Sequence, residues 1–182
     1  GIALTTSFPA TPLGAQLRAV AETINVRERL FASRQVFFVG LGGFDTHSGQ
    51  AQRLPKLLSQ IDGALAAFQA AMEALGLARD VTLFTASDFG RTLAVNGDGT
   101  DHGWGGHQIV LGGAVKGGDI YGVLPPPTLG HEADSGGGRL IPSVAVDTYA
   151  AELGRWFGLS ENELSAALPG LGNFDPLPNS FI

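Results

Sequence analysis

Cysteine is absent from the 182 residues. Its absence excludes a disulfide framework, a thiolate zinc site and a cysteine nucleophile. The chain also lacks any run of Lys or Arg, since 11 basic residues stand against 17 acidic ones and the net charge is −6. Nucleic acid is therefore not an expected partner, and neither is an anionic membrane surface. No apolar stretch is long enough to cross a bilayer, so we expect no membrane span.

Charged residues are scarce and glycine is abundant, with 15% Asp, Glu, Lys and Arg against 27 Gly. This composition favours a densely packed α/β domain with many tight turns over a disordered chain. The length corresponds to one domain, and we expect a single α/β domain over residues 1–182. Because the first residue is Gly rather than Met, we also expect either processing or a longer parent gene.

Apolar spacing predicts two helices and two strands in the first half of the chain. The helices are expected over residues 12–32 and 52–75, the second one followed by Gly76 as its C-cap. Continuous apolar runs at residues 36–41 and 80–85 are typical of buried strands. A strand, a helical crossover and a second strand form a βαβ unit, so we expect a parallel pair with a right-handed connection.

Shorter elements are expected in the second half of the chain. A third strand is predicted at residues 108–112 and an edge strand at 120–122, before a Pro- and Gly-rich surface segment. An amphipathic helix is predicted over residues 144–157. Ser160-x-x-Glu163 then supplies a capping box for a short last helix. These elements together predict an α/β fold with a mostly parallel sheet.

Asp and His side chains follow the predicted strands. Asp45 and His47 come directly after the first apolar run, in Gly-Gly-Phe-Asp-Thr-His, and Asp88 follows the second run. A later Gly-rich loop carries Asp101 and His102. Because the carboxyl ends of parallel strands meet at one edge of a sheet, we expect these three clusters to converge.

Carboxylate and imidazole groups in one cluster suit zinc, with manganese and iron as alternatives. The predicted metal ligands are Asp45, His47, Asp88 and His102. Two ions held a few ångströms apart would clamp the attacking and leaving oxygens of an ester displacement. Arg91 is predicted to bind substrate, because its planar guanidinium suits a tetrahedral oxyanion.

Each candidate also has an ordinary structural interpretation. Asp45 alone is typical of a turn cap beside a surface His47, and Asp88 is equally typical of a cap after its strand. Asp101-His102 fits common turn chemistry, and Arg91 fits a salt bridge. A cluster that only hydrogen-bonds its own loops, with no metal bound, is therefore a further hypothesis. The occurrence of all three clusters at predicted sheet edges favours the metal.

Four motifs in order resemble a known family. They are Gly-Gly-Phe-Asp-Thr-His-x-x-Gln at Gly42–Gln50, Ser-Asp-Phe-Gly-Arg-Thr at Ser87–Thr92, Gly-Thr-Asp-His-Gly at Gly99–Gly103 and Gly-Gly-Ala-Val-Lys-Gly-Gly at Gly112–Gly118. This series is similar to domain-of-unknown-function family 1501, and the late segments 156–159 and 168–171 also fit that family. The resemblance covers most of the chain from about Val36.

The resemblance implies the alkaline phosphatase and sulfatase superfamily, and hence a three-layer α/β/α sandwich with a mostly parallel sheet, present here in part. It implies that Asp45, His47 and His102 hold one metal ion and that Asp88 serves a second. Phe89 departs from the pattern, because it stands where a second-metal His is expected. Members of the family are bacterial and exported, so a periplasmic or exported location is implied.

The superfamily's nucleophile lies in an N-terminal half that nothing in residues 1–34 matches. We therefore expect this chain to be the C-terminal part of a longer protein, a metal-dependent hydrolase of small phosphate or sulfate esters. Without a nucleophile, no turnover is expected from the chain as it stands. The alternative is a non-catalytic exported binding or assembly module on the same scaffold. The sequence leaves the oligomeric state open.

Overall fold

A computed structural model describes residues 3–182 of the chain. These residues form two compact units. Unit 1 contains the described residues up to Phe84 together with Val95–Asp101 and Val110–Gly113, and unit 2 contains Thr85–Ala94, His102–Ile109 and Ala114–Ile182. The expectation of a single domain stays a prediction.

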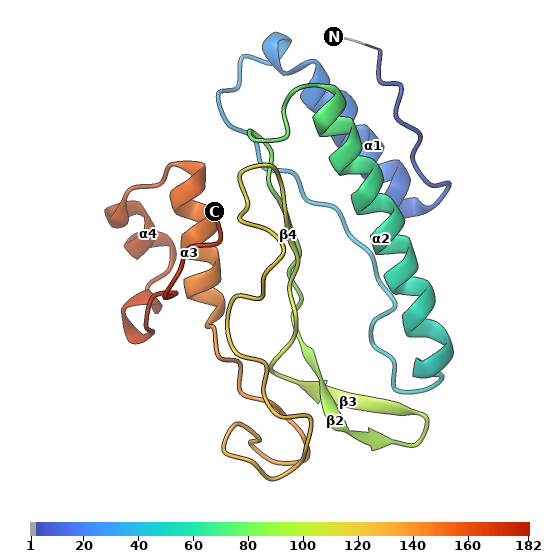
Figure 1. Ribbon diagram of the computed structural model, residues 1–182, viewed down its shortest axis with the longest axis vertical. Coiled ribbons are helices and arrows are strands. Elements are labelled where there is room, and N and C mark those ends of the chain that lie inside the picture. The colour runs from blue at the N-terminus through green and yellow to red at the C-terminus, as the bar shows by residue number, and fades with distance from the viewer. Residues whose placement is uncertain (1–2) are drawn as a thin grey trace. The chain divides into compact units, whose positions relative to one another are not determined.

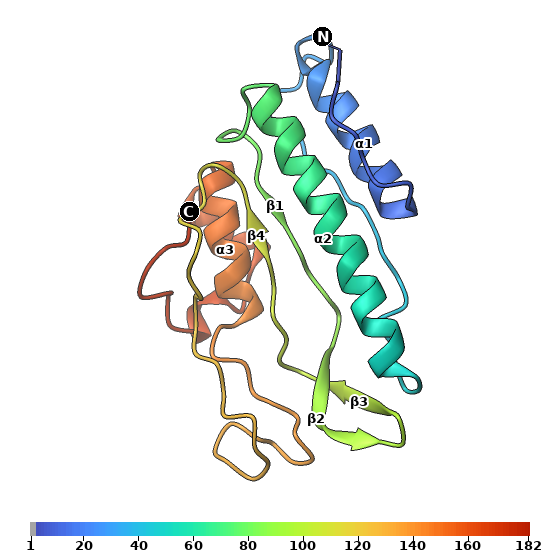
Figure 2. The same ribbon diagram turned by 45° about the vertical axis from the view of Figure 1, so that its right-hand side comes forward.

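Two helices form the body of unit 1, α1 (Pro12–Asn25) and α2 (Gln50–Ala74). Figures 1 and 2 show them side by side and running in the same direction. The predicted start of α1 is confirmed, since Thr11 accepts a hydrogen bond from the Gly14 backbone N–H at 3.1 Å and Pro12 is the first helical residue. The helix ends earlier than predicted and is followed by a 3₁₀ turn, η1 (Arg27–Arg29).

The glycine predicted to end α2 lies one residue after the C-cap, which is Leu75. Gly76 has a φ of +71°, and its N–H bonds the Glu73 carbonyl at 3.0 Å. The N–H of Leu77 bonds the Met72 carbonyl at 2.8 Å, which completes a Schellman motif. Both Leu77 and Met72 are buried in the core, so the cap also carries its usual apolar contact.

The core of unit 1 lies between α1 and the C-terminal half of α2. Its buried members are Leu13, Leu17, Ala21, Ile24, Ala64, Phe68, Ala71, Met72 and Leu77. The predicted apolar stripe of α2 continues toward its N-terminus, but α1 is the shorter helix and leaves that half uncovered. Leu58, for example, is 51% exposed.

The predicted buried strand at residues 36–41 is wrong. The segment is extended, but no ladder of hydrogen bonds pairs it with a strand among residues 3–182. Val39 and Leu41 pack against the core, whereas Phe38 is 95% exposed. The side-chain amide of Gln16 bonds both the N–H and the carbonyl of Gly40, at 2.9 and 3.0 Å, and so takes the place of a neighbouring strand.

The predicted three-layer α/β/α sandwich is contradicted. The described sheets are two small two-stranded ones. In unit 1, β1 (Leu83–Phe84) pairs antiparallel with β4 (Val110–Leu111), with Leu83 opposite Leu111. The expected βαβ unit fails because the first apolar run has no strand partner among residues 3–182 and the second has an antiparallel one.

A β-hairpin stands where irregular polar loops were predicted. Its strands are β2 (Gly90–Asn96) and β3 (Gly99–Gly103), joined by a two-residue turn. Gly97 has a φ of +66° at the first turn position, which is the conformation that favours glycine in tight hairpins. The hairpin tip, Val95–Asp101, belongs to unit 1.

Unit 2 carries the C-terminal helices. The predicted helix is confirmed as α3 (Val146–Phe157), and the capping box of Ser160 and Glu163 opens α4 (Glu161–Ala167). A 3₁₀ turn, η2 (Leu171–Asn173), follows in the tail. The predicted edge strand at residues 120–122 is wrong, because this segment has no strand partner among the described residues.

Asp134 organises a glycine-rich loop of unit 2. Its carboxylate accepts hydrogen bonds from the backbone N–H groups of Gly130, Gly136 and Gly138, at 2.8, 2.9 and 2.9 Å. These bonds, the one from Gly130 first, lower the pKa of Asp134 below its ordinary value. The Gly138 carbonyl in turn accepts the N–H of Leu93, so the loop continues the hydrogen bonding of β2.

None of the helices over residues 3–182 is both long and apolar enough to cross a membrane.

Candidate metal centre

A tight turn presents Asp45 and His47 after the extended segment. Gly43 has a φ of +100°, and the N–H of Thr46 bonds the Phe44 carbonyl at 2.9 Å. Thr46 itself is 1% exposed, whereas the side chains on either side of it are about half exposed. The buried threonine therefore anchors the turn and leaves the carboxylate and the imidazole facing outward.

The hairpin tip packs against the Thr46 turn within unit 1 and is hydrogen-bonded to it. The N–H of Thr100 bonds the Thr46 carbonyl at 3.4 Å. The Asp98 carbonyl accepts the N–H of Gln50 at 3.1 Å, which satisfies one of the N–H groups left open at the start of α2. A Cβ at Gly99 would collide with the backbone of Thr46 and of the residue after it, so β3 can approach this closely only with glycine there.

His47 lies between two carboxylates of unit 1. Its Nε2 is 2.9 Å from Asp45 Oδ1, and its Nδ1 is 3.5 Å from Asp101 Oδ1. Asn96 donates a hydrogen bond from Nδ2 to the same Asp101 oxygen at 3.0 Å. The side chains of Asp45, His47 and Asp101 are 57%, 50% and 45% exposed, so the group faces solvent.

Asp45 and His47 are the two predicted metal ligands of unit 1, and they lie in contact, with 2.9 Å between Asp45 Oδ1 and His47 Nε2. His102, the predicted later ligand, belongs to unit 2. Zinc binds imidazole nitrogen and carboxylate oxygen at about 2.0–2.2 Å, so two donors on one ion stand up to about 4 Å apart. The carboxylate and the imidazole of unit 1 are within that separation, and their metal role is a candidate role.

The other predicted site residues lie in unit 2, together with His102. Asp88 is exposed in the bend before β2. Phe89 stacks on His102, with ring centroids 4.3 Å apart and planes 10° apart. The guanidinium carbon of Arg91 lies 5.8 Å from the centroid of the same Phe89 ring. The metal role of Asp88 and the substrate role of Arg91 stay predictions.

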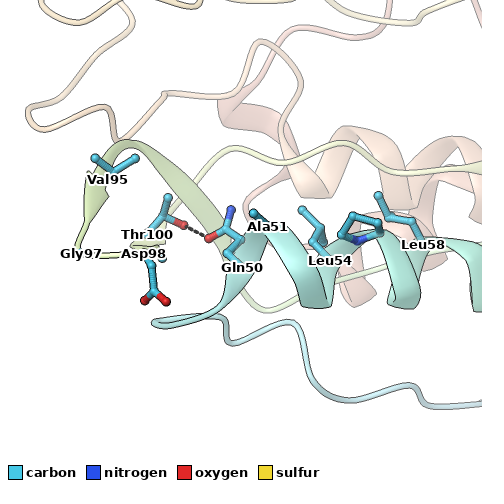
Figure 3. Close-up of a pocket in the computed structure, with 10 residues that line it drawn as sticks. Gln50, Ala51, Leu54, Leu58, Val95, Gly97, Asp98 and Thr100 are labelled. Atoms are coloured by element: carbon cyan, nitrogen blue, oxygen red, sulfur yellow. Dashed lines mark hydrogen bonds between the residues drawn. The ribbon is translucent and has the colours of Figure 1, made fainter.

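A groove of about 450 Å³ lies beside the hairpin tip in unit 1. Figure 3 shows its walls, formed by Leu54 and Leu58 of α2 and by Val95 of β2. The hydroxyl of Thr100 donates a hydrogen bond of 2.8 Å to the side-chain oxygen of Gln50 across the floor. The groove is mainly aliphatic and contains none of the predicted site residues.

Comparison with known proteins decides the family. A family model described as "Protein of unknown function (DUF1501)" matches residues 10–137. The chain belongs to this family. The matched residues of this DUF1501 chain include all the predicted site residues, whereas α3 and α4 lie beyond them. Neither the curated proteins nor the solved structures gave a match.

Sequence reasoning missed the residues that hold the Thr46 turn in place. Gly99 was recognised only as part of a family motif, and Asn96 was not singled out, although both sit on a hairpin that packs against the Thr46 turn. The signal in the sequence is Gly97-Asp98, because glycine at the first position of a two-residue turn is typical of a β-hairpin. Asp101 was recognised as a polar residue of the loop but not as a neighbour of His47.

Proposed function

We propose that this DUF1501 chain binds one divalent metal ion through Asp45 and His47. The observation that supports this proposal is the contact of the two donors within unit 1, where Asp45 Oδ1 lies 2.9 Å from His47 Nε2 and both side chains face solvent. His102 stays a predicted further ligand, from its own motif. Zinc is the ion that this donor set suits best, with manganese or iron as alternatives.

In this proposal the metal centre serves hydrolysis of phosphate or sulfate esters. Such an ion polarises the ester oxygen and lowers the pKa of a bound water. The resemblance to the alkaline phosphatase and sulfatase superfamily suggests this ester class, and Arg91 is the residue proposed to bind the charged ester oxygens. A periplasmic or exported location belongs to the same proposal and follows from the same resemblance.

The metal site is tested by thermal denaturation in zinc and in manganese. A ligand at 100 times its Kd stabilises the folded state by about 2.7 kcal/mol, which corresponds to roughly 5–11 °C for a chain of this size. Asp45→Ala and His47→Ala are expected to lose this shift, while Asp62→Ala on the exposed side of α2 keeps it. Equal metal content by elemental analysis in wild type and in both ligand variants would contradict the proposal.

A second candidate function is a non-catalytic exported binding or assembly module. Phe89 favours it, because a phenyl ring stacked on His102 supplies no ligand for a second ion. Because no turnover is expected from this chain under either function, a longer homologous protein of the family is loaded with metal and assayed against a panel of aryl phosphates and aryl sulfates. Turnover that disappears when its counterpart of His47 is replaced by Ala supports the hydrolase, whereas metal binding without any turnover supports the module.

A further inference from the structure

We propose that Asp101 is the positioning residue of the metal centre: it holds the Nδ1 side of His47, so that Nε2 is the nitrogen that binds the ion. This inference rests on the proposed metal centre and assigns it one residue and one tautomer. Asp101 lies in β3, whereas His47 lies in the turn after the extended segment, so the pairing depends on the hairpin.

The distances distinguish the two nitrogens of His47. Nε2 is 2.9 Å from Asp45 Oδ1, so Nε2 lies on the side of the other proposed ligand of unit 1. Nδ1 is 3.5 Å from Asp101 Oδ1 on the other edge of the ring. An imidazole that binds a metal through one nitrogen carries its proton on the other, and that N–H is commonly held by a carboxylate. Asp101 is the carboxylate at that edge.

Asp101 is itself held by a neighbour on the hairpin. Asn96 Nδ2 donates a hydrogen bond of 3.0 Å to Asp101 Oδ1, the oxygen that faces His47. Asn96 ends β2 and Asp101 lies in β3, so the bond crosses the hairpin. Asn96, Asp101 and His47 therefore form a chain of contacts that leads from the hairpin to the ring that is proposed to bind the metal. Binding of a cation to Nε2 makes Nδ1–H a stronger donor, which strengthens the last link of this chain.

The test compares zinc affinity, measured by competition with a chromogenic chelator, across hairpin variants. Loss of an outer carboxylate of this kind weakens metal binding by about 10–100-fold. We expect a loss of that size in Asp101→Ala, a smaller loss in the isosteric Asp101→Asn, which keeps an acceptor oxygen, and the smallest loss in Asn96→Ala. Asp98→Ala is the matched control, because Asp98 sits in the same hairpin turn and bonds α2 through its backbone carbonyl.

The tautomer of His47 is read directly by long-range ¹H–¹⁵N NMR of the zinc-loaded protein. The proposal requires a protonated Nδ1 and a zinc-bound Nε2. Unchanged zinc affinity in Asp101→Ala overturns it, and so does zinc on Nδ1. Binding abolished as fully in Asp101→Ala as in His47→Ala also overturns it, because Asp101 would then be a ligand and not a positioning residue.

The metal-free protein separates this inference from the proposed function. If wild type binds neither zinc nor manganese, the metal centre is refuted. The NMR signals of the His47 ring in the metal-free protein then test only whether Asp101 contacts His47. A change of these signals in Asp101→Asn, with none in Asp98→Ala, upholds the contact between Asp101 and His47. Ring signals that are identical in all three proteins overturn the contact as well.

Discussion

Gly99→Ala is the substitution that most directly tests how the hairpin builds the site. An added Cβ would collide with the backbone of Thr46 and His47, and neither atom group is the end of a flexible side chain. Overpacking of this kind costs about 1–3 kcal/mol, and rigid neighbours place Gly99→Ala at the upper end, about 2–3 kcal/mol. Replacing Gly by Ala also restricts the unfolded chain, which stabilises the protein by only about 0.4–1 kcal/mol. The overpacking cost is the larger of the two effects, so we expect the free energy of unfolding to fall by about 2 kcal/mol.

The assay is thermal denaturation followed by circular dichroism, together with zinc affinity. A loss of about 2 kcal/mol lowers Tm by roughly 4–8 °C in a chain of this size. Gly42→Ala is the matched control, because its Cβ meets nothing within 4 Å and its φ is outside the left-handed region. It should leave Tm unchanged or slightly raised. If Gly99→Ala has the same Tm and zinc affinity as Gly42→Ala, the close approach of β3 to the Thr46 turn is wrong.

Three further predictions concern the framework around the site. Met72→Ala empties a fully buried position and should cost about 2–5 kcal/mol in chemical denaturation, whereas Leu58→Ala, on the same helix but 51% exposed, should cost much less. Ser160→Ala removes the capping box of α4 and should cost about 0.5–2 kcal/mol; an unchanged Tm would contradict the cap. The lowered pKa of Asp134 stabilises the fold above the ordinary aspartate pKa, and this contribution is lost as pH falls through the lowered value. Asp134→Asn should therefore flatten the decline of Tm below about pH 4, and a decline as steep as in wild type would refute it.

The helices could be predicted from the sequence because their signals are local. Thr11-Pro12 before α1, Gly76 after α2 and the pair Ser160 and Glu163 before α4 each specify a cap within a few residues. These caps use side-chain and backbone groups that are neighbours in the chain, so no knowledge of tertiary structure was needed to place them.

The sheet could not be predicted because strand pairing is not local. The apolar run at residues 36–41 has the composition of a buried strand, but composition does not specify a partner. In the structure Gln16 bonds Gly40, and Phe38 stays exposed. The run at 80–85 became a two-residue strand opposite Val110 and Leu111, and its antiparallel direction is set by partners about 25 residues away.

The candidate site, too, could be predicted in its local features but not in its long-range contacts. Asp45 and His47 could be recognised from their spacing and from the glycines before them, and His102 from its own motif. Within unit 1, the neighbour of the turn that carries Asp45 and His47 is not the edge of a parallel sheet, as expected, but a hairpin tip that approaches closely at Gly99. Donor types can be read from a sequence, whereas the element that brings donors together depends on a steric fit between distant backbones.

Phe89 bears on the number of ions in the proposed metal centre. It stacks on His102, with planes 10° apart and centroids 4.3 Å apart, and so covers one face of that ring. A metal ion binds an imidazole nitrogen in the plane of the ring, so a phenyl ring on the face does not occupy the direction of a metal bond. A phenyl ring also contributes no donor, so the residue at the position expected for a second-metal His cannot bind an ion. We therefore expect one zinc per chain by elemental analysis after dialysis, and a ratio of two would contradict this assignment.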